Sequence, residues 1–157
     1  DCLDTWDHAA NALDLQHALG DVCSPLRGLI ESVPAWRLWP LSDRVPLNGA
    51  QQMAQGRVAL LGDAAHPMRP YLAQGAGMAI EDAAALAHSL ASPGNDIALK
   101  LARYAQGRWQ RNARVQSRAL RNGQIFHATG LVRWGRDLST RLLGQGLIDM
   151  PWLYQSA

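Results

Sequence analysis

The residues best suited to chemistry lie in the stretch 57–90, RVALLGDAAHPMRPYLAQGAGMAIEDAAALAHSL. An apolar run ends there at a Gly-Asp pair, and a loop with two prolines leads to a Gly-Ala-Gly triplet and an alanine-rich segment. The ionised carboxylate of Asp63 only accepts hydrogen bonds, which suits it to ribose or polyol hydroxyls. Gly62 lets the backbone turn and lets a ligand approach closely. The pair predicts a ligand site, although a strand, Gly-Asp, loop and helix also occur in α/β proteins as plain structure.

The triplet Gly75, Ala76 and Gly77 stands immediately before a helix predicted from Met78 to Leu90. The first N–H groups of a helix have no partner inside it, and the positive end of the helix dipole lies beside them. We expect these amides to hold a group that is electron-rich or becomes anionic during a reaction. The triplet is not the usual dinucleotide fingerprint, because the third glycine of G-x-G-x-x-G would fall at Ile80.

The elements that must position these residues are a strand and a helix. The apolar run 57–61 predicts a strand buried on both faces of a parallel sheet, which would put Asp63 at the carboxyl edge where open α/β folds bind ligands. Two helices and an extended segment are predicted before this region: a helix Leu3–Leu19 containing Trp6 and closed by Gly20, a helix with Ser24 as N-cap and Pro25 in its first turn, and extended chain over 36–47. Two helices are predicted after it. The first runs from Ile97 to Asn122, capped by Asp96 and stopped at Gly123, and the second is Leu131–Leu143, ended by Gly144-Gln145-Gly146.

Composition limits the class of protein. Of 157 residues, 48% are hydrophobic and 18% charged, which excludes a disordered chain, and no apolar run is long enough to cross a membrane. Cys2 and Cys23 have no metal-type spacing, and the five histidines show no ligand pattern, so we expect no metal site and a reducing, cytoplasmic location. The first residue is Asp1, so we expect a piece of a longer protein.

The central segment GDAAHPMRPYLAQGAGMAIEDAAALA closely resembles the second FAD-binding motif of the class A flavoprotein monooxygenases, which include the salicylate and para-hydroxybenzoate hydroxylases. The flanking segments WRLWPLSDRVPL and ALKLARYAQGRWQRNARVQ are similar to those of salicylate-hydroxylase-like members. The resemblance covers roughly residues 36–127.

The resemblance implies a cofactor and its ligands. Asp63, after Gly62, would bind the ribitol hydroxyls of FAD, and Pro70 would pack beside the isoalloxazine ring. The backbone of Gly75, Ala76 and Gly77 would face the pyrimidine edge of the flavin, where negative charge accumulates on reduction. Many relatives have asparagine where Gly77 stands, so only the backbone contribution carries over.

The resemblance also implies a reaction in which the cofactor does the chemistry. NAD(P)H reduces the flavin, a flavin C4a-hydroperoxide forms with O2, and its terminal oxygen passes to an aromatic substrate. We assign no catalytic side chain: His66 has no visible partner and is interpreted as a structural histidine hydrogen-bonded in the loop. Arg69 is interpreted as solvent-exposed, with contact to an acidic substrate as the alternative, while Met68 and Tyr71 suit the core and the substrate side of the flavin equally.

A full member of the family is more than twice this length and begins with a βαβ unit that holds the pyrophosphate. We therefore expect an α/β parent protein and a chain that is its mostly helical C-terminal portion with a remnant of sheet. Residues 1–50 would be a remnant of the substrate-binding domain, 51–92 the second FAD-binding segment and 93–157 a helical region. We expect the chain alone to bind FAD weakly or not at all, to hydroxylate nothing, and to self-associate or pair with residual N-terminal peptide through its orphan strand.

Two other functions are consistent with the sequence. Of 15 Lys and Arg residues only Lys100 is a lysine, and a row of arginines runs from Arg103 to Arg121, spaced three or four positions apart from Arg108 on. Such a row could bind nucleic acid phosphates, but the net charge of +2 favours a solvated face or salt bridges to missing acidic partners. The other alternative is a non-catalytic structural module that kept the fold.

Overall fold

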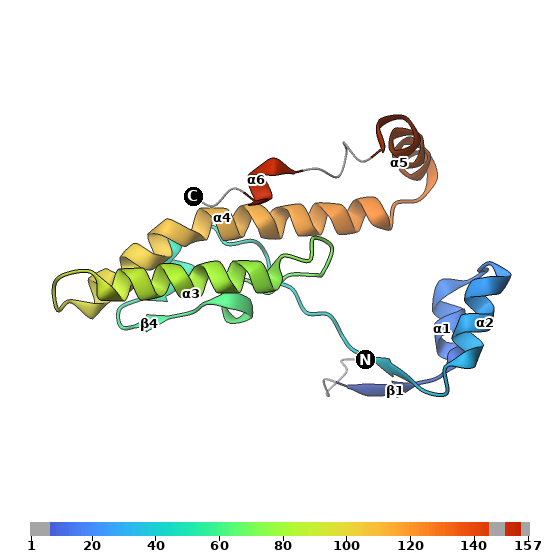
Figure 1. Cartoon of the computed structure of the whole chain (residues 1–157), viewed down its shortest axis with the longest axis horizontal. Helices are drawn as coiled ribbons and strands as arrows, with labels where there is room; N and C mark the ends of the chain where they lie inside the picture. The colour runs from blue at the N-terminus through green and yellow to red at the C-terminus, as the bar shows by residue number, and fades with distance from the viewer. Residues whose placement is uncertain (1–6, 145–149, 155–157) are drawn as a thin grey trace. The chain divides into compact units, whose positions relative to one another are not determined.

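The computed structural model describes residues 7–144 and 150–154, and the chain divides into two compact units, Asp1–Leu41 and Ser42–Ala157 (Figure 1). Helices make up most of the described residues, which confirms the prediction of a mostly helical chain with little sheet. The first unit contains β1 (His8–Ala10), α1 (Ala12–Leu19), α2 (Ser24–Ser32) and β2 (Trp36–Leu38). The second contains η1 (Ala50–Gln52), β3 (Ala54–Gln55), β4 (Val58–Ala59), η2 (Gly62–Ala64), α3 (Gly75–Ala91), α4 (Ile97–Phe126), α5 (Gly130–Leu143) and α6 (Pro151–Tyr154).

The first unit is a helical pair joined to a two-stranded antiparallel ribbon. Strand β1 pairs with β2, with His8 opposite Leu38. The carboxylate of Asp7 accepts hydrogen bonds from Arg37 and from Trp39 Nε1, the latter at 3.0 Å. These contacts join the two strands beyond the ends of the short ladder.

The helix predicted over Leu3–Leu19 is wrong in its first part. Residues His8–Ala10 form a strand, and Asn11 starts the helix, because its side chain accepts the N–H groups of Leu13 and Asp14 at 2.8 and 3.0 Å. Trp6 lies outside the described residues. Gly20, at φ 67°, ends α1 as predicted.

The start of α2 differs from the prediction by one residue. Cys23 occupies the N-cap position, without a side-chain hydrogen bond to the helix, and Ser24 is the first helical residue. Pro25 still lies in the first turn, where its missing N–H leaves no helical bond unmade.

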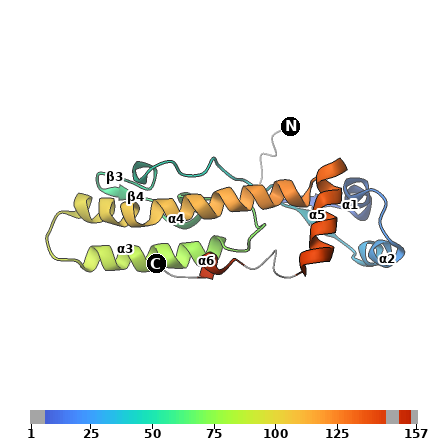
Figure 2. The same ribbon diagram turned by 90° about the horizontal axis from the view of Figure 1, so that it is seen from above.

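The second unit is built on α3 and α4, which lie side by side and run in opposite directions (Figures 1 and 2). Asp96 caps α4 by accepting the Leu99 N–H at 3.1 Å, as the sequence predicted. The turns η1 and η2 and the strand β3 pack against these two helices. Two apolar clusters form the core, one around Met53, Ala65 and Tyr104 and one around Met78, Val115 and Leu153.

The prediction of a buried parallel strand over 57–61 is wrong. Val58–Ala59 forms a two-residue strand that pairs antiparallel with Ala54–Gln55, and Gly56, at φ 58°, makes the turn between them. Val58 is 65% exposed. The turn at Gly56 lets the chain fold back on residues 54–55, so the apolar run pairs with the segment just before it and not with a parallel strand.

The predicted stop of the long helix at Gly123 is also wrong, since α4 continues to Phe126. Gly123 is buried inside the helix, where a Cβ atom would lie 2.6 Å from Cε2 of Tyr71. The glycine therefore serves close packing against the loop before α3. His127 follows the helix and bonds back to the Gly123 carbonyl at 3.1 Å. The predicted helix Leu131–Leu143 is α5, ended by Gly144, while Gln145 and Gly146 lie outside the described residues.

Candidate functional site

The Gly-Asp pair forms a tight turn, η2, directly after the hairpin. Gly62 is at φ 55°, a conformation that favours glycine, and a Cβ atom there would lie 3.1 Å from Cβ of Ala79 on α3. Gly62 is buried while Asp63 is exposed. The turn therefore packs closely on α3 and presents the Asp63 carboxylate at the surface.

Helix α3 begins at Gly75, three residues before the predicted start at Met78. The Met78 N–H already bonds to the Gln74 carbonyl at 2.9 Å, so Gly75, Ala76 and Gly77 are the first turn, whose amides have no acceptor within the helix. Ala73, just before it, has φ 53°, an uncommon conformation for a residue with a side chain. The triplet thus supplies the expected amides without a helical acceptor, but it does so as the first turn of the helix and not as a segment before it.

The structure brings the carboxylate and the triplet together. Oδ1 of Asp63 lies 3.9 Å from the point that a Cβ atom of Gly75 would occupy, although the two residues come from different elements. Gly75 and Gly77 are half-buried and Ala76 is exposed, so the first turn of α3 is accessible. A carboxylate, a group able to accept hydrogen bonds from hydroxyls, thus lies beside amides of the kind that bind electron-rich groups.

The loop between η2 and α3 carries the remaining candidates. Pro70 is exposed in a turn in which its carbonyl accepts the Ala73 N–H at 3.2 Å. Met68 packs with the Met78 cluster, and Tyr71 packs edge-on against Phe126, with ring centroids 5.9 Å apart. Arg69 was expected to reach solvent or a substrate. It is exposed, as the first of these interpretations has it, and it also forms an ion pair with Asp43 at 2.6 Å.

A network of buried polar side chains lies beneath this site. His66 and Asp82 have no exposed side-chain surface, and Nε2 of His66 lies 2.6 Å from Oδ2 of Asp82. The expected hydrogen bond of His66 is thereby confirmed, although its partner is Asp82 of α3 and not a group of the loop. The carboxylate of Asp82 also accepts from the Gly62 N–H at 3.2 Å, from Arg108 Nε at 2.8 Å and from Asn112 Nδ2 at 3.0 Å.

The electrostatics of the network follow from these contacts. Burial alone would raise the pKa of Asp82, but the hydrogen bonds from His66, Asn112, Arg108 and the Gly62 amide outweigh it and lower that pKa to about 2. The hydrogen bond from Arg111, opposed by partial burial and helped by Arg108, lowers the pKa of Glu81. Both carboxylates are therefore ionised at neutral pH, and burial together with Asp82 raises the pKa of Tyr104.

Side chains of α4 also fix the backbone of the loop along its length. Tyr104 Oη donates to the Leu60 carbonyl at 3.0 Å and Gln116 Nε2 to the Pro67 carbonyl at 3.3 Å. Asn122 Nδ2 donates to the Tyr71 carbonyl at 3.3 Å. Side chains of α4 thus hold the chain before the Gly-Asp turn, at Leu60, and after it, at Pro67 and Tyr71.

Asp82, Asn112 and Gln116 were not predicted as part of a site. A signal was present, because the Glu-Asp pair 81–82 interrupts the apolar stretch 76–87, and the two amides stand four positions apart on one side of α4. The arginine row was interpreted as solvated or paired with missing partners. Arg108 and Arg111 instead pair with Glu81, at 2.8 and 2.6 Å, and the guanidinium of Arg114 lies 4.0 Å from the ring centroid of Trp152.

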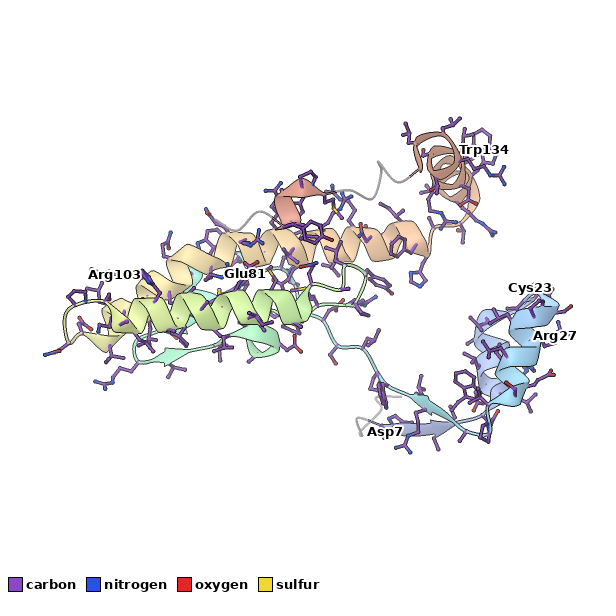
Figure 3. The ribbon with its side chains drawn as sticks, viewed as in Figure 1. Asp7, Cys23, Arg27, Glu81, Arg103 and Trp134 are labelled. Atoms are coloured by element: carbon purple, nitrogen blue, oxygen red, sulfur yellow. The ribbon has the colours of Figure 1, made fainter. Side chains whose placement is uncertain are left out.

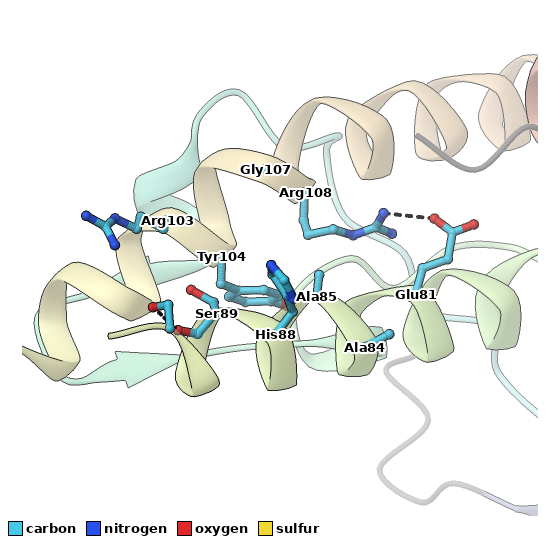
Figure 4. A pocket seen from close by; sticks show the side chains of 10 residues that line it. Glu81, Ala84, Ala85, His88, Ser89, Arg103, Tyr104, Gly107 and Arg108 are labelled. Carbon is cyan, nitrogen blue, oxygen red and sulfur yellow. Dashed lines mark hydrogen bonds and ion pairs between the residues drawn. The ribbon is translucent and has the colours of Figure 1, made fainter. Parts of the chain in front are cut away.

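Two cavities of the second unit lie away from the candidate residues. One, of about 660 Å³, lies between α3 and α4 and is lined by His88, Arg103 and Tyr104 among others; Figure 4 shows the Arg108–Glu81 ion pair at its end. The second, between α4 and α5, is lined by Arg118, Phe126 and Val132 among others. The candidate residues of η2 and of the first turn of α3 line neither of these two cavities. Figure 3 shows the side chains, including Glu81 facing α4.

Neither a metal site nor a membrane span is found in the part of the chain that the structure describes. No group of three or more His, Cys, Asp or Glu side chains there could hold a metal ion. None of its helices is both long enough and apolar enough to cross a membrane.

The fold places a turn with an exposed carboxylate beside the first turn of a helix, and comparison with known proteins identifies the family. The family model described as an FAD binding domain matches residues 24–119, more than half of the chain. The chain therefore belongs to this FAD-binding family, and its resemblance to the class A flavoprotein aromatic hydroxylases is confirmed.

Relatives of known activity agree with this assignment. The chain is 39% identical over 136 residues to 3-hydroxybenzoate 6-hydroxylase 2 of Aquipseudomonas alcaligenes, covering 85% of the chain and 42% of that protein. It is 34% identical over 154 residues to salicylate hydroxylase of Pseudomonas putida, covering 95% of the chain and 34% of that protein. The chain thus spans about two fifths of the length of these relatives, or less.

Solved structures show the same fold. A salicylate hydroxylase substrate complex matches the whole chain with a TM-score of 0.80 and 28% identity, over 38% of that protein. Klebsiella pneumoniae HpxO complexed with FAD and uric acid matches 87% of the chain with a TM-score of 0.66 and 26% identity, over 36% of that protein.

Proposed function

We propose that this chain is the part of an FAD-dependent aromatic hydroxylase that binds the ribityl chain and the pyrimidine edge of the flavin. Asp63 accepts hydrogen bonds from ribityl hydroxyls, and Gly62 holds the turn that presents it. The amides of Gly75, Ala76 and Gly77 donate to the pyrimidine edge. The single observation that carries this proposal is the 3.9 Å separation between Asp63 Oδ1 and the Cβ position of Gly75.

The residues fit the cofactor in their chemistry as well as their placement. The first turn of a helix stabilises negative charge through its free amides and its dipole, and reduced flavin carries such charge at its pyrimidine edge. A glycine at 75 leaves the backbone open to a flat ring, and Pro70 in the same loop supplies an apolar face beside it. Bound FAD would supply the redox chemistry, taking electrons from NAD(P)H and using O2 to hydroxylate an aromatic substrate.

The substrate class is taken from the relatives. They are named for 3-hydroxybenzoate and salicylate, which are small aromatic acids. We propose an aromatic substrate for the whole enzyme, with residues 1–50 as part of its substrate-binding domain, 51–92 as the second FAD-binding segment and 93–157 as the helical region that supports it.

The chain alone is proposed to bind FAD weakly and to be inactive, because it spans about two fifths of its relatives and holds no segment for the pyrophosphate. Exposed apolar residues support association with further chain, either a second copy or an N-terminal portion. They include Val58 on the hairpin and Ile80 on α3, which are 65% and 71% exposed.

Titration of the ¹⁵N-labelled chain with FAD tests the proposal by NMR. We expect weak binding, with shifts at the amides of Gly75, Ala76 and Gly77, and loss of these shifts in Asp63→Ala. The matched control is Asp96→Ala, which removes the N-cap carboxylate of α4, beyond the C-terminal end of α3, and should leave the shifts unchanged. Absence of shifts at the triplet, or shifts confined to α4, would contradict the site. Micromolar or tighter binding by calorimetry would contradict the proposed division of FAD between this chain and further sequence.

Nucleic acid binding is not favoured by the observed contacts. Arg108 and Arg111 are paired with carboxylates and Arg114 stacks on Trp152, so half-buried contacts within the chain use much of the arginine row. A filter-binding assay at low salt with duplex and single-stranded nucleic acid would show no retention.

A further inference from the structure

Asp82 is the point at which the Gly-Asp turn is joined to the helical pair. Its carboxylate is fully buried and accepts four hydrogen bonds, two from the segment of the turn and two from α4. Oδ2 receives the Gly62 N–H and His66 Nε2, while Oδ1 receives Arg108 Nε and Asn112 Nδ2. The two oxygens therefore face two different parts of the molecule.

The hydrogen bond from Gly62 to Asp82 holds the backbone immediately before Asp63. Asp63 is the residue whose carboxylate lies beside the first turn of α3. The Gly62 carbonyl accepts the N–H groups of Ala65 and His66, both at 2.9 Å. Since His66 is bonded to the same carboxylate, Asp82 holds both ends of the turn.

Glu81 provides an internal comparison, because it is the neighbouring carboxylate on α3. It also binds α4, through Arg108 and Arg111, but its hydrogen bonds go to these arginines and not to the turn. Its side chain is 31% exposed, whereas that of Asp82 is not exposed. A role in joining the helices is shared by both residues, while contact with the turn is a property of Asp82.

We propose that Asp82 is a positioning residue of the flavin site, which sets the place of the Asp63 carboxylate by holding the Gly62 amide and His66 against α4. The inference rests on the proposed function, since it is flavin binding that the position of Asp63 serves. It concerns geometry within this chain, so it can be measured without any cofactor.

The test is amide hydrogen exchange by NMR on the flavin-free chain. In Asp82→Asn one oxygen becomes an NH₂ group, and the Arg108 guanidinium will attract the oxygen that remains. The Gly62 N–H then loses its acceptor, so its exchange should accelerate by about tenfold or more relative to the amide of Val115 in the core of α4. The ratio to Val115 removes any general loss of stability.

Glu81→Gln is the matched control, and the Gly62 to Val115 ratio should stay within twofold of the parent chain. An unchanged ratio in Asp82→Asn, or an equal change in Glu81→Gln, would overturn the proposal, because either result would mean that Asp82 only joins the helices.

A second pair of variants covers the case in which Asp82→Asn does not fold. His66→Leu removes one donor from the turn and should raise the Gly62 ratio, whereas His66→Gln places an amide nitrogen near the position of Nε2 and should restore it. Equal ratios in the two variants would contradict the proposal.

The flavin arm separates this inference from the proposed function. Addition of FAD to the parent chain should shift the triplet amides, and Asp82→Asn should reduce those shifts at least tenfold at equal FAD. If the parent chain shows no shifts while the exchange ratio still responds, the proposed function fails and the positioning of the turn by Asp82 stands.

Discussion

The two faces of α3 differ in what they contribute. The inner face, against α4 and η2, packs apolar side chains such as Met78 and Leu86 and also buries two polar ones, Asp82 and Ser89. The outer face is exposed and mostly apolar; besides His88 it consists of Ala76, Ile80, Ala83, Ala84, Ala87 and Leu90. A surface helix normally exposes its polar stripe, so the buried carboxylate and the exposed apolar residues both depart from the usual pattern.

This difference teaches that the two faces have different tasks. The inner face contacts the Gly-Asp turn through directed hydrogen bonds, which form in only one geometry. The outer face presents apolar side chains of the kind that other chain segments cover. A change at the buried, directed contacts can therefore be compared with a matched change on an exposed face.

The largest expected effect is at Arg108. Arg108→Met removes the cation that faces the buried carboxylate of Asp82 and the part-buried one of Glu81, and should lower the free energy of unfolding by about 3–5 kcal/mol. The measurement is urea denaturation followed by circular dichroism.

Arg103→Met is the control for this change, because it removes the same type of side chain from an exposed position of α4. It should alter the free energy of unfolding by no more than about 0.5 kcal/mol. Equal losses in the two variants would show that the arginines act through net charge and not through the buried contacts.

A smaller effect separates two glycines of α4. Gly123→Ala places a Cβ atom against the ring of Tyr71, at 2.6 Å from Cε2, and should destabilise the chain by about 1–3 kcal/mol through overpacking. Gly107 has no atom within 4 Å of its Cβ position, so Gly107→Ala should stabilise the helix by about 0.5–1 kcal/mol. Thermal denaturation of both variants gives the comparison, and a gain of stability in Gly123→Ala would contradict the close packing of Tyr71.

The local signals in the sequence predicted much of this arrangement. The ends of three helices were predicted because the residue at each end, Gly20, Asp96 or Gly144, acts on the backbone next to it. Such an effect depends only on the local sequence, so the sequence is enough to predict it. The motif 62–87 indicated the flavin family, and the first turn of α3 holds the predicted triplet. The grouping of Asp63 with this triplet was expected from the motif, and its assignment to flavin binding stays a proposal.

Long-range pairing was harder to predict. The apolar run 57–61 has the composition of a buried strand, and only the turn at Gly56 reveals that it folds back on residues 54–55. Gly123 resembles a helix stop until Tyr71, 52 positions earlier in the sequence, is seen packed against it. The carboxylate partners of Arg108 lie on another helix, and helical spacing within α4 carries no information about them.

The smallest effect on stability is expected on the outer face of α3, where it bears on association. Ile80→Glu places a charge at a side chain that is 71% exposed, so the free energy of unfolding of the monomer should change by no more than about 0.5 kcal/mol. If the apolar face joins two copies, sedimentation should show a shift from dimer to monomer, because a buried carboxylate without a partner opposes association. Gln106→Glu adds the same charge at an exposed position of α4 and should leave the dimer intact. A parent chain that is monomeric at all concentrations would contradict self-association and leave an N-terminal portion of the enzyme as the proposed cover for this face.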